Sequence, residues 1–373
     1  MTRPTLRRVV ALTAATSLSV LLVELPALAA PGDLDTSFDG DGTVTTAVKA
    51  SSDGQAGVAQ AANGDVLVAG NQGNAAGTSN GFAVVEYRPA GGRDHNFGGG
   101  DGIATANFGD CSFAEGMAVD SQGRIVVAGF RRSPCNSADT RIVVARFQAD
   151  GTLDPSFGGG SGKEVFALAG FGEQADAVAM DGDRIVLAGQ VEPRFQHRSV
   201  FLLLRLNDDG HLDHTFSNDG FAFASLGLEG SRAFAVTVQS DHRAAACGTT
   251  TNSQGDERFG VARFTASGTL DTSFSSDGKA TVNFSSGDDE CTSIAQDGSG
   301  FVVGGMKNST DCALAGLTST GALDGSFGTG GRVSESLSTG QDEVFGLSVG
   351  GSGKVVATAV KDNFGHDRFA VLR

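Results

Sequence analysis

Carboxylate side chains recur along this chain at similar intervals, each time just before or at the start of a short apolar segment. Carboxylates that meet at one surface attract cations and the basic groups of peptides. After Lys49, the one basic residue among these positions is Arg232. We therefore assign a candidate ligand face to these acids, with ordinary charged surface loops as the alternative. Its members are Asp53, Glu115, Glu173, Asp176, Glu229, Asp288, Asp289, Glu290, Asp342 and Glu343.

The five cysteines can form two disulfides and leave one thiol over. Cys111 and Cys135 lie on either side of one expected hairpin, and Cys291 and Cys312 flank the corresponding hairpin further along. We predict the disulfides Cys111–Cys135 and Cys291–Cys312. Cys247 lies in an apolar run and is predicted to be a buried free thiol. A nucleophilic role is not expected for it, because burial in apolar surroundings raises the pKa of a thiol.

Metal chemistry has a weaker basis in the sequence. The run Asp39-Gly40-Asp41-Gly42 combines carboxylates with glycines, as calcium loops do. The equivalent positions further along carry residues without a carboxylate, which argues against a repeated metal site; they are Gly98, Gly158, Ser217 and Ser275. The six histidines have no zinc-ligand spacing. We expect no cofactor, with calcium as a minor alternative.

A motif of the form Leu-Asp-x-Ser-Phe, closed by a glycine, occurs in six copies that begin near residues 34, 93, 153, 212, 270 and 323. A spacing of about sixty residues indicates one supersecondary unit repeated in tandem. The aspartate and serine suit turns in which side-chain oxygens accept backbone N–H groups, and the phenylalanine is expected to fill the space between units. The residues given this structural role are Asp35, Phe38, Asp94, Phe97, Asp154, Phe157, Asp213, Phe216, Asp271, Phe274, Asp324 and Phe327.

Each unit contains four runs of strand length, which in the second unit are residues 102–108, 116–119, 124–129 and 141–147. The last two runs are apolar on both faces, so their sheet must be covered on both sides. Four-stranded sheets stacked around an axis meet this need, whereas the rungs of a β-helix are shorter than these units. The sequence predicts an all-β, six-bladed β-propeller of four-stranded antiparallel blades.

The order of the runs also predicts how the blades are oriented and how the ring closes. The run at 116–119 is expected to line the channel, and the run after each motif to form the half-exposed outer edge. The chain then begins with a spare outer strand at 42–46 and ends with a third strand at 369–373. Pairing the N-terminal strand with the C-terminal blade removes an exposed edge on each side, so we expect the ring to close there.

One strand position carries arginine in four units, at Arg146, Arg205, Arg263 and Arg373, and Glu86 and Gly316 in the other two. Arginines that converge on a channel can hold a carboxylate ligand. Here each arginine lies far from the expected axis and, where a motif follows it, shortly precedes the motif aspartate. We therefore favour structural Arg–Asp bridges, because a guanidinium pairs well with a carboxylate at such corners.

The phrases Gly-Met-Ala-Val-Asp, Gly-Arg-Ile-Val-Val-Ala-Gly and Arg-Ile-Val-Val-Ala-Arg-Phe resemble the inner three strands of NHL-type propeller blades. Together with the motif copies, which cover almost the whole chain, the sequence resembles the delta-60 repeat family, a set of secreted bacterial proteins predicted to form propellers. The second copy departs from the motif at Arg93 and Asn96, and the strand in the fifth unit drifts to Ala315-Gly316-Leu317. The resemblance implies no established activity or catalytic residue.

Residues 1–29 have the pattern of a secretory signal peptide: arginines, an apolar run and the small-residue site Ala27-Leu28-Ala29. We expect export to the exterior or the cell envelope, by the general or the twin-arginine route, and one propeller domain over residues 30–373. No other segment is long and apolar enough to span a bilayer. The net charge of −16 disfavours nucleic acid and anionic membranes.

We expect a monomer that binds a protein, peptide or cationic ligand through the loops of one face. The favoured function is a secreted, non-catalytic binding module whose ligand the sequence does not identify. The alternative is a metal-dependent hydrolase or lactonase with its site at the channel mouth, which rests on analogy with other six-bladed propellers. The absence of tryptophan and the single tyrosine, Tyr87, argue against the stacking platforms that sugar sites favour.

Overall fold

The computed structural model describes residues 34–48, 54–73, 79–109, 111–168, 170–193, 198–227, 229–351, 353–361 and 368–373. This part of the chain forms 23 β-strands and one short 3-10 helix, η1 (Gly158–Gly160). None of its helices is long and apolar enough to cross a membrane. The expected signal peptide and Asp53 lie outside the described residues.

The strands form six successive antiparallel groups, one for each repeat, which we call blades 1–6. A single parallel bridge between Asn80 and Ser112 joins blades 1 and 2 into one sheet. Blade 1 contains β1 (Gly54–Gln60), β2 (Val66–Gly73), β3 (Ser79–Tyr87) and β4 (Ile103–Asn107). Blade 2 contains β5 (Cys111–Val119), β6 (Ile125–Arg132), β7 (Thr140–Phe147) and β8 (Lys163–Phe166). Blade 3 contains β9 (Gly170–Asp181), β10 (Arg184–Pro193), β11 (Val200–Leu206) and β12 (Phe221–Ala224).

The second half of the chain repeats the pattern until the last blade. Blade 4 contains β13 (Gly230–Val238), β14 (Ala244–Thr251), β15 (Glu257–Phe264) and β16 (Lys279–Val282). Blade 5 contains β17 (Glu290–Asp297), β18 (Gly300–Lys307), β19 (Asp311–Leu317) and β20 (Arg332–Glu335). Blade 6 has three strands, β21 (Asp342–Val349), β22 (Val355–Lys361) and β23 (Arg368–Leu372).

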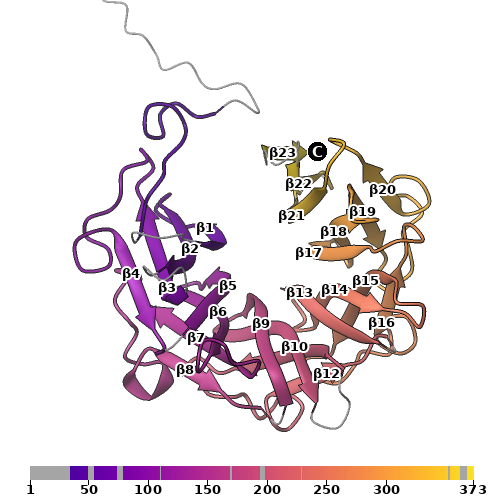
Figure 1. The fold of residues 1–373 in the computed structure, drawn as a ribbon, viewed down its shortest axis with the longest axis horizontal. Coiled ribbons are helices and arrows are strands. Elements are labelled where there is room, and N and C mark those ends of the chain that lie inside the picture. The colour runs from indigo at the N-terminus through magenta and orange to yellow at the C-terminus, as the bar shows by residue number, and fades with distance from the viewer. Residues whose placement is uncertain are drawn as a thin grey trace, which may run out of the picture.

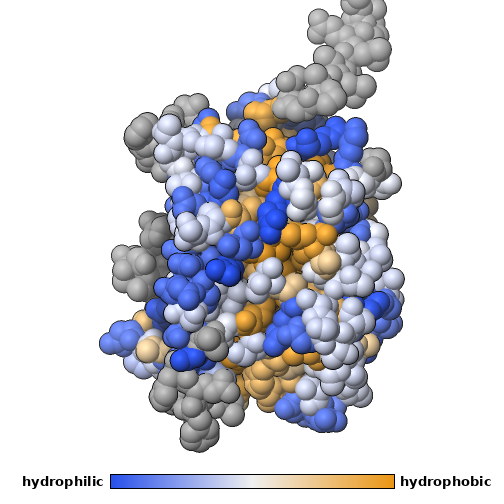
Figure 2. All heavy atoms as spheres, turned by 90° about the vertical axis from the view of Figure 1, so that its right-hand side faces the viewer, coloured by the Kyte–Doolittle hydropathy of each residue, from blue (hydrophilic) through white to orange (hydrophobic). Residues whose placement is uncertain are grey.

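The blades stand side by side along an arc, with the first strand of each blade innermost (Figure 1). The middle strands of blades 2 to 5 are buried on both faces, as the apolar runs predict; β7 and β11 are almost wholly buried. The second strands of the end blades, β2 and β22, are only partly buried. Val126 and Val144 of blade 2 share one apolar cluster with Leu187 of blade 3, so the core consists of layers between neighbouring blades. The strands after the motif, such as β12 and β16, alternate between buried and exposed residues. The side that bears the later outer strands shows a hydrophobic band between polar regions (Figure 2).

The repeated motif forms the corner between the third strand and the outer strand, as predicted. Asp154 Oδ1 accepts hydrogen bonds from the backbone N–H and the hydroxyl of Ser156, at 2.9 and 2.8 Å. Phe157 is fully buried, and a Cβ on Gly210 of the next blade would lie 2.7 Å from its ring. Gly210 also has a positive φ of 89°, so only glycine suits this close approach. The phenylalanine therefore fills the space between blades.

The predicted Arg–Asp bridges are also present at the corners of blades 2, 3 and 4. The Nε atoms of Arg146, Arg205 and Arg263 lie 2.7, 2.8 and 2.8 Å from the Oδ2 atoms of their motif aspartates, Asp154, Asp213 and Asp271. The three arginine side chains are at most 3% exposed. A guanidinium nitrogen of Arg205 also donates to the carbonyl oxygen of Ala266 in the next blade, at 2.6 Å. These arginines join neighbouring blades.

The expected closing strand is not formed. Residues 43–47 are irregular, and β23 pairs only with β22. Instead, the backbone N–H of Asp39 donates to the carbonyl oxygen of Ala90, the contact that the second to fifth motifs make with the corner that follows each of them. The N-terminal corner is thus held by blade 1, at the opposite end of the arc from blade 6 (Figure 1).

The disulfides agree with the prediction at one pair and contradict it at the other. Cys111 is bonded to Cys135, in the loop between β6 and β7. Cys291 is bonded to Cys247, not to Cys312, and Cys312 is the buried free thiol. The strand β18 lies between Cys291 on β17 and Cys312 on β19. Two strand spacings of about 4.8 Å exceed the reach of a disulfide, which needs Cα atoms within about 7 Å.

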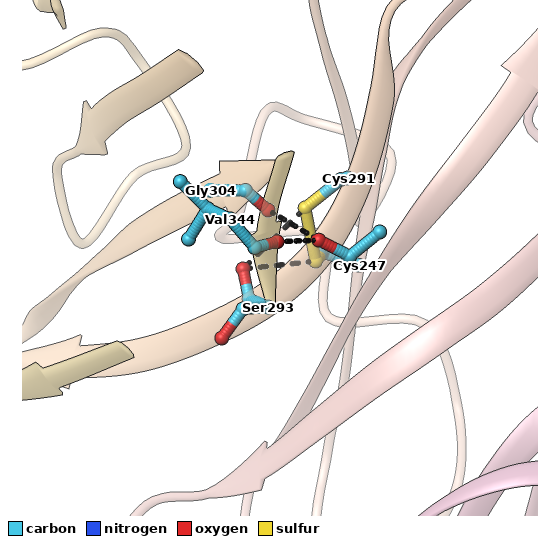
Figure 3. The surroundings of a disulfide bond; sticks show 6 residues. Cys247, Cys291, Ser293, Gly304 and Val344 are labelled. Atoms are coloured by element: carbon cyan, nitrogen blue, oxygen red, sulfur yellow. Dashed lines mark hydrogen bonds between the residues drawn. A yellow bond between two sulfur atoms is a disulfide. The ribbon is translucent and has the colours of Figure 1, made fainter. Parts of the chain in front are cut away.

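The observed Cys247–Cys291 bond instead joins β14 of blade 4 to β17 of blade 5, with Cα atoms 6.0 Å apart. Both sulfur atoms lie beside Ser293, whose carbonyl oxygen is 3.4 Å from Cys247 Sγ (Figure 3). This disulfide therefore links two blades, whereas Cys111–Cys135 links parts of one blade.

Candidate functional site

The innermost strands share an irregularity that shapes the candidate ligand face. Each has a shift in register against its neighbour after two to four residue pairs, typical of a β-bulge, for example between Ala114 and Gly116 and between Ala175 and Ala177. Glu115 and Asp176 occupy the bulged positions of β5 and β9. Arg232, Glu290 and Glu343 lie two residues before the bulges of β13, β17 and β21. Five inner strands thus carry a charged side chain at the bulge or two residues before it.

We call Glu115, Asp176, Arg232, Glu290 and Glu343 the channel arc. Arg232 lies in its middle and binds Asp176 of the preceding blade through two contacts, Nη2–Oδ1 at 2.5 Å and Nε–Oδ2 at 3.0 Å. Arg232 also packs over the ring of Phe234, 4.8 Å from its centroid. Because the pair with Asp176 uses the one basic side chain of the arc, the other three carboxylates have no ion-pair partner of their own in the described structure.

Burial and mutual repulsion shift the protonation of these carboxyl groups. Burial, followed by the charge of Asp176, raises the pKa of Glu115 to about 7. Burial, followed by the charge of Glu290, raises the pKa of Glu343 to about 7. The pKa of Glu290 is also raised, by burial and then by Glu257, although Arg232 opposes the shift. The arc is therefore a set of desolvated acids that a cationic group would stabilise.

Three of the predicted ligand residues are instead internal anchors of the loops that enter the inner strands. Asp289 is fully buried and accepts hydrogen bonds from the N–H groups of Phe284 and Asn308, at 2.7 and 3.0 Å. Asp342 is fully buried and accepts from Leu337 and Ser338. The third, Glu173, is also fully buried and lies 3.6 Å from Arg141. Their oxygens face the protein interior, because they lie three residues before the bulge, and we exclude them from the site.

The remaining predicted residues lie at the edge of this face. Glu229 is exposed and lies 3.7 Å from Arg198. Asp288 accepts the backbone N–H of Glu257 at 3.1 Å and raises the pKa of that glutamate, after burial. The sequence analysis grouped these residues with the arc because all of them precede or begin the inner-strand segments. It did not predict the bulge, which separates side chains that point into the protein from those that face the channel.

A second acidic cluster was missed by the sequence analysis. One carboxylate oxygen each from Asp65, Glu86 and Asp94 lies within 4.8 Å of the other two. It lies at the corner of blade 1, where β3 is followed by the motif, and it is the one such cluster of possible metal ligands among the described residues. Burial, and then the charges of Asp65 and Asp94, raise the pKa of Glu86 to about 7. The sequence signal for this cluster was Glu86, which occupies the strand position that carries an arginine in blades 2, 3 and 4.

Comparisons with known proteins agree with the fold. Residues 121–157 and 239–274 match the family model "Domain of unknown function (DUF5122) beta-propeller". The matches cover equivalent parts of blades 2 and 4, from the turn before the second strand to the motif phenylalanine. No curated protein has a sequence similar enough to be matched.

Several solved structures are similar in shape, all at low sequence identity. Sqt1 from Chaetomium thermophilum is 12% identical with a TM-score of 0.43, over 84% of this chain and 67% of its own. A glucose dehydrogenase is 8% identical with a TM-score of 0.46, over 86% and 98%. An ulvan lyase of polysaccharide lyase family PL25 is 8% identical with a TM-score of 0.45, over 84% and 77%. The family match in two of the units and the arrangement of the six blades both agree with a β-propeller fold.

Proposed function

We propose that the protein is an exported binding module whose channel arc holds a basic segment of a peptide or protein. The observation that carries this proposal is the set Glu115, Glu290 and Glu343, three partly buried carboxylates on the inner strands of blades 2, 5 and 6. The one arginine near them, Arg232, is paired with Asp176. Lysine or arginine side chains of a ligand would replace the water that these acids lost on folding.

Three further features support a binding role at this face. The overall charge of −16 would attract a basic partner over distance. The disulfide at Cys291 lies next to Glu290 and joins blade 4 to blade 5, so this part of the arc is held in place before a ligand arrives. The loops that enter the inner strands are anchored by buried acids, which keeps the mouth ordered.

Titration with a fluorescently labelled oligolysine peptide tests the proposal. We expect saturable binding that weakens as salt is raised, because the contacts are ionic. Binding should strengthen from pH 6 to pH 8, since Glu115 and Glu343 lose their protons around pH 7 and only the carboxylate form attracts lysine.

The variant Glu290→Gln/Glu343→Gln should weaken oligolysine binding about tenfold or more, the loss expected for two charge-assisted contacts. Glu335→Gln on the outer strand β20 removes an exposed acid far from the channel and should bind like the wild type. If both variants weaken oligolysine binding equally, the effect is due to net charge alone, and a binding site at the channel arc is refuted.

The metal-dependent hydrolase is not favoured. Among the described residues, the cluster suited to a metal lies at the corner of blade 1 and not at the channel mouth. The channel arc has carboxylates from four blades but no histidine. We therefore propose a non-catalytic role.

We also propose that the ring closes in solution and that the protein is exported as a monomer of the delta-60 type. The hydrogen bond from Asp39 to Ala90 supports this closure, because it attaches the N-terminal corner to blade 1 as an earlier corner would be attached; in a closed ring, residues 42–46 would then complete blade 6. Export through a cleaved leader at residues 1–29 is supported by the two disulfides, which persist in oxidising compartments.

A further inference from the structure

The corner of blade 1 differs from its counterparts by charge reversal at two positions. In blades 2, 3 and 4, the last residue but one of the third strand is Arg146, Arg205 or Arg263, and in blade 1 it is Glu86. The residue just before the second strand, or at its first position in blade 3, is an arginine in blades 2, 3 and 4, and Asp65 in blade 1; these arginines are Arg124, Arg184 and Arg243. The motif aspartate, here Asp94, is kept. In blade 1, two carboxylates thus replace two guanidinium groups, and the carboxylate of the motif aspartate is unchanged.

The backbone of the corner is otherwise the same as in the other blades. The N–H of Asp94 donates to the carbonyl oxygen of Glu86 at 2.9 Å, as the N–H of Asp154 donates to that of Arg146. The N–H of Glu86 donates to Gly102 as that of Arg146 donates to Gly162. The corner of blade 1 can therefore be compared directly with the corners of blades 2 to 4. The space that holds arginine side chains in those blades is lined by carboxylates in blade 1.

The three carboxylates are incompletely satisfied by the protein. Asp65 and Glu86 are 6% and 7% exposed. Asp65 Oδ2 accepts a hydrogen bond from the Asn63 side chain at 2.6 Å. Asp94 Oδ1 accepts from Arg88 at 2.7 Å and from the N–H of Asn96 at 3.0 Å. The Glu86 carboxylate has no hydrogen-bond partner among the described residues, although its oxygen lies within 4.8 Å of the other two.

We propose that Asp65, Glu86 and Asp94 bind a calcium ion, which takes the place of the guanidinium groups at the corners of blades 2 to 4. Three hard, anionic oxygens suit calcium, and water completes its shell of six to eight ligands. The side chain of Asp94 is 18% exposed, so the ion has access from solvent. The carbonyl oxygen of Ala149, equivalent to the Ala266 oxygen that binds Arg205, is the backbone ligand we expect. This site is separate from the channel arc.

Calcium should therefore stabilise the fold. Saturating calcium, compared with EDTA, should raise the Tm of the wild-type protein by a few degrees, since an ion that binds only the folded state stabilises it. Terbium can be used as a second probe, because Tyr87 beside Glu86 is the sole tyrosine and the chain has no tryptophan. Luminescence of terbium excited through tyrosine should appear with the wild type, fall on addition of calcium, and be lost in Tyr87→Phe.

Two variants separate a bound ion from a general effect of calcium. Asp65→Arg/Glu86→Arg restores the pattern of blades 2 to 4; it should fold, gain stability in EDTA and lose the Tm shift with calcium. Glu86→Gln keeps the shape of the side chain and should reduce the calcium shift. Asp39→Asn/Asp41→Asn, in the exposed acidic run before blade 1, should keep the full shift.

The proposal is overturned if calcium leaves the wild-type Tm unchanged, if magnesium but not calcium raises it, or if the shift persists in both Glu86 variants. Glu290→Gln/Glu343→Gln should keep the calcium shift while losing oligolysine binding. A failure of the peptide experiment therefore leaves the calcium site standing, and a failure of the calcium experiment leaves the channel arc standing.

Discussion

The motif aspartates show how one residue type serves different ends according to its neighbours. Asp213 accepts two hydrogen bonds from Thr215 through Oδ1 and binds Arg205 through Oδ2. The same guanidinium lies over the ring of Phe216, 4.8 Å from its centroid. Each corner of this type therefore combines a turn, a buried ion pair and a phenylalanine that fills the space between blades. Where the arginine is absent, as at Glu86, the turn persists but the charge balance changes.

The buried ion pair Arg205–Asp213 should contribute far more to the free energy of unfolding than the exposed pair Arg88–Asp94 of blade 1. Arg205→Ala leaves the buried Asp213 with only the longer contact to Arg184, at 3.9 Å, and should lower the free energy of unfolding by about 3 kcal/mol. Arg88→Ala, which breaks the pair with Asp94 at a side chain that is 51% exposed, should change stability little. Urea unfolding of both variants measures the difference. Similar losses in the two would show that the corner arginines act through something other than burial.

At the scale of elements, the bulged inner strands and the disulfides determine which side chains reach the channel. The bulge in β5 turns Glu115 toward the arc, and the residues three positions before a bulge are turned inward as anchors. The Cys247–Cys291 bond links β14 to β17 across a blade boundary. Because cohesion between blades otherwise depends on side-chain packing and corner contacts, this covalent link holds blade 5 in position.

Removal of either disulfide should destabilise the protein in proportion to the chain it encloses. Cys247→Ser/Cys291→Ser removes a link between residues 44 apart in sequence and should lower the free energy of unfolding by about 4 kcal/mol. For Cys111→Ser/Cys135→Ser, whose residues are 24 apart, we expect a loss of about 3.5 kcal/mol.

Thiol counting under denaturing, non-reducing conditions should find one thiol. Peptide mapping should identify it as Cys312, which is unreactive in the native state because burial raises its pKa to about 12. A Cys291–Cys312 peptide would contradict this pairing.

At the scale of the whole molecule, the arc of six blades has two ends that carry exposed apolar side chains. Val58 on β1 is 71% exposed, Phe345 on β21 is 55% exposed and Val371 on β23 is 69% exposed. In the middle of the arc, the innermost strands pack against each other, as Gly116 does against Ala177. The two ends lack this neighbour, which favours their association in a closed ring.

Truncation of the chain before residue 49 tests the closure. If residues 42–46 complete blade 6, their removal exposes the edge of β23 and should lower the Tm by several degrees relative to residues 30–373. The truncated protein should also form dimers or larger species in light scattering, because an open strand edge pairs with other chains. An unchanged Tm and a monomeric truncated protein would show that the N-terminal segment takes no part in closing the ring.

The sequence by itself determined the features that depend on local patterns. The period of the motif predicted the number of units, runs apolar on both faces predicted stacked sheets, and the spacing of Arg146 and Asp154 predicted their bridge. Cys111 and Cys135 were paired correctly because a loop returns Cys135 to the start of β5. In each case the interacting residues belong to one unit, so their separation in sequence limits their separation in space.

Contacts between neighbouring blades and strands were determined only by the tertiary structure. Cys291 lies nearer to Cys247 of the preceding blade than to Cys312 of its own, because β18 separates the latter pair. The acids Asp289 and Glu290 are adjacent in sequence, yet only Glu290 joins the arc, because successive residues of a strand point to opposite faces. Asp65, Glu86 and Asp94 meet only because the hairpin and the corner of blade 1 fold onto the same place. Contacts between blades and across strands depend on register and stacking, which no local pattern of residues specifies.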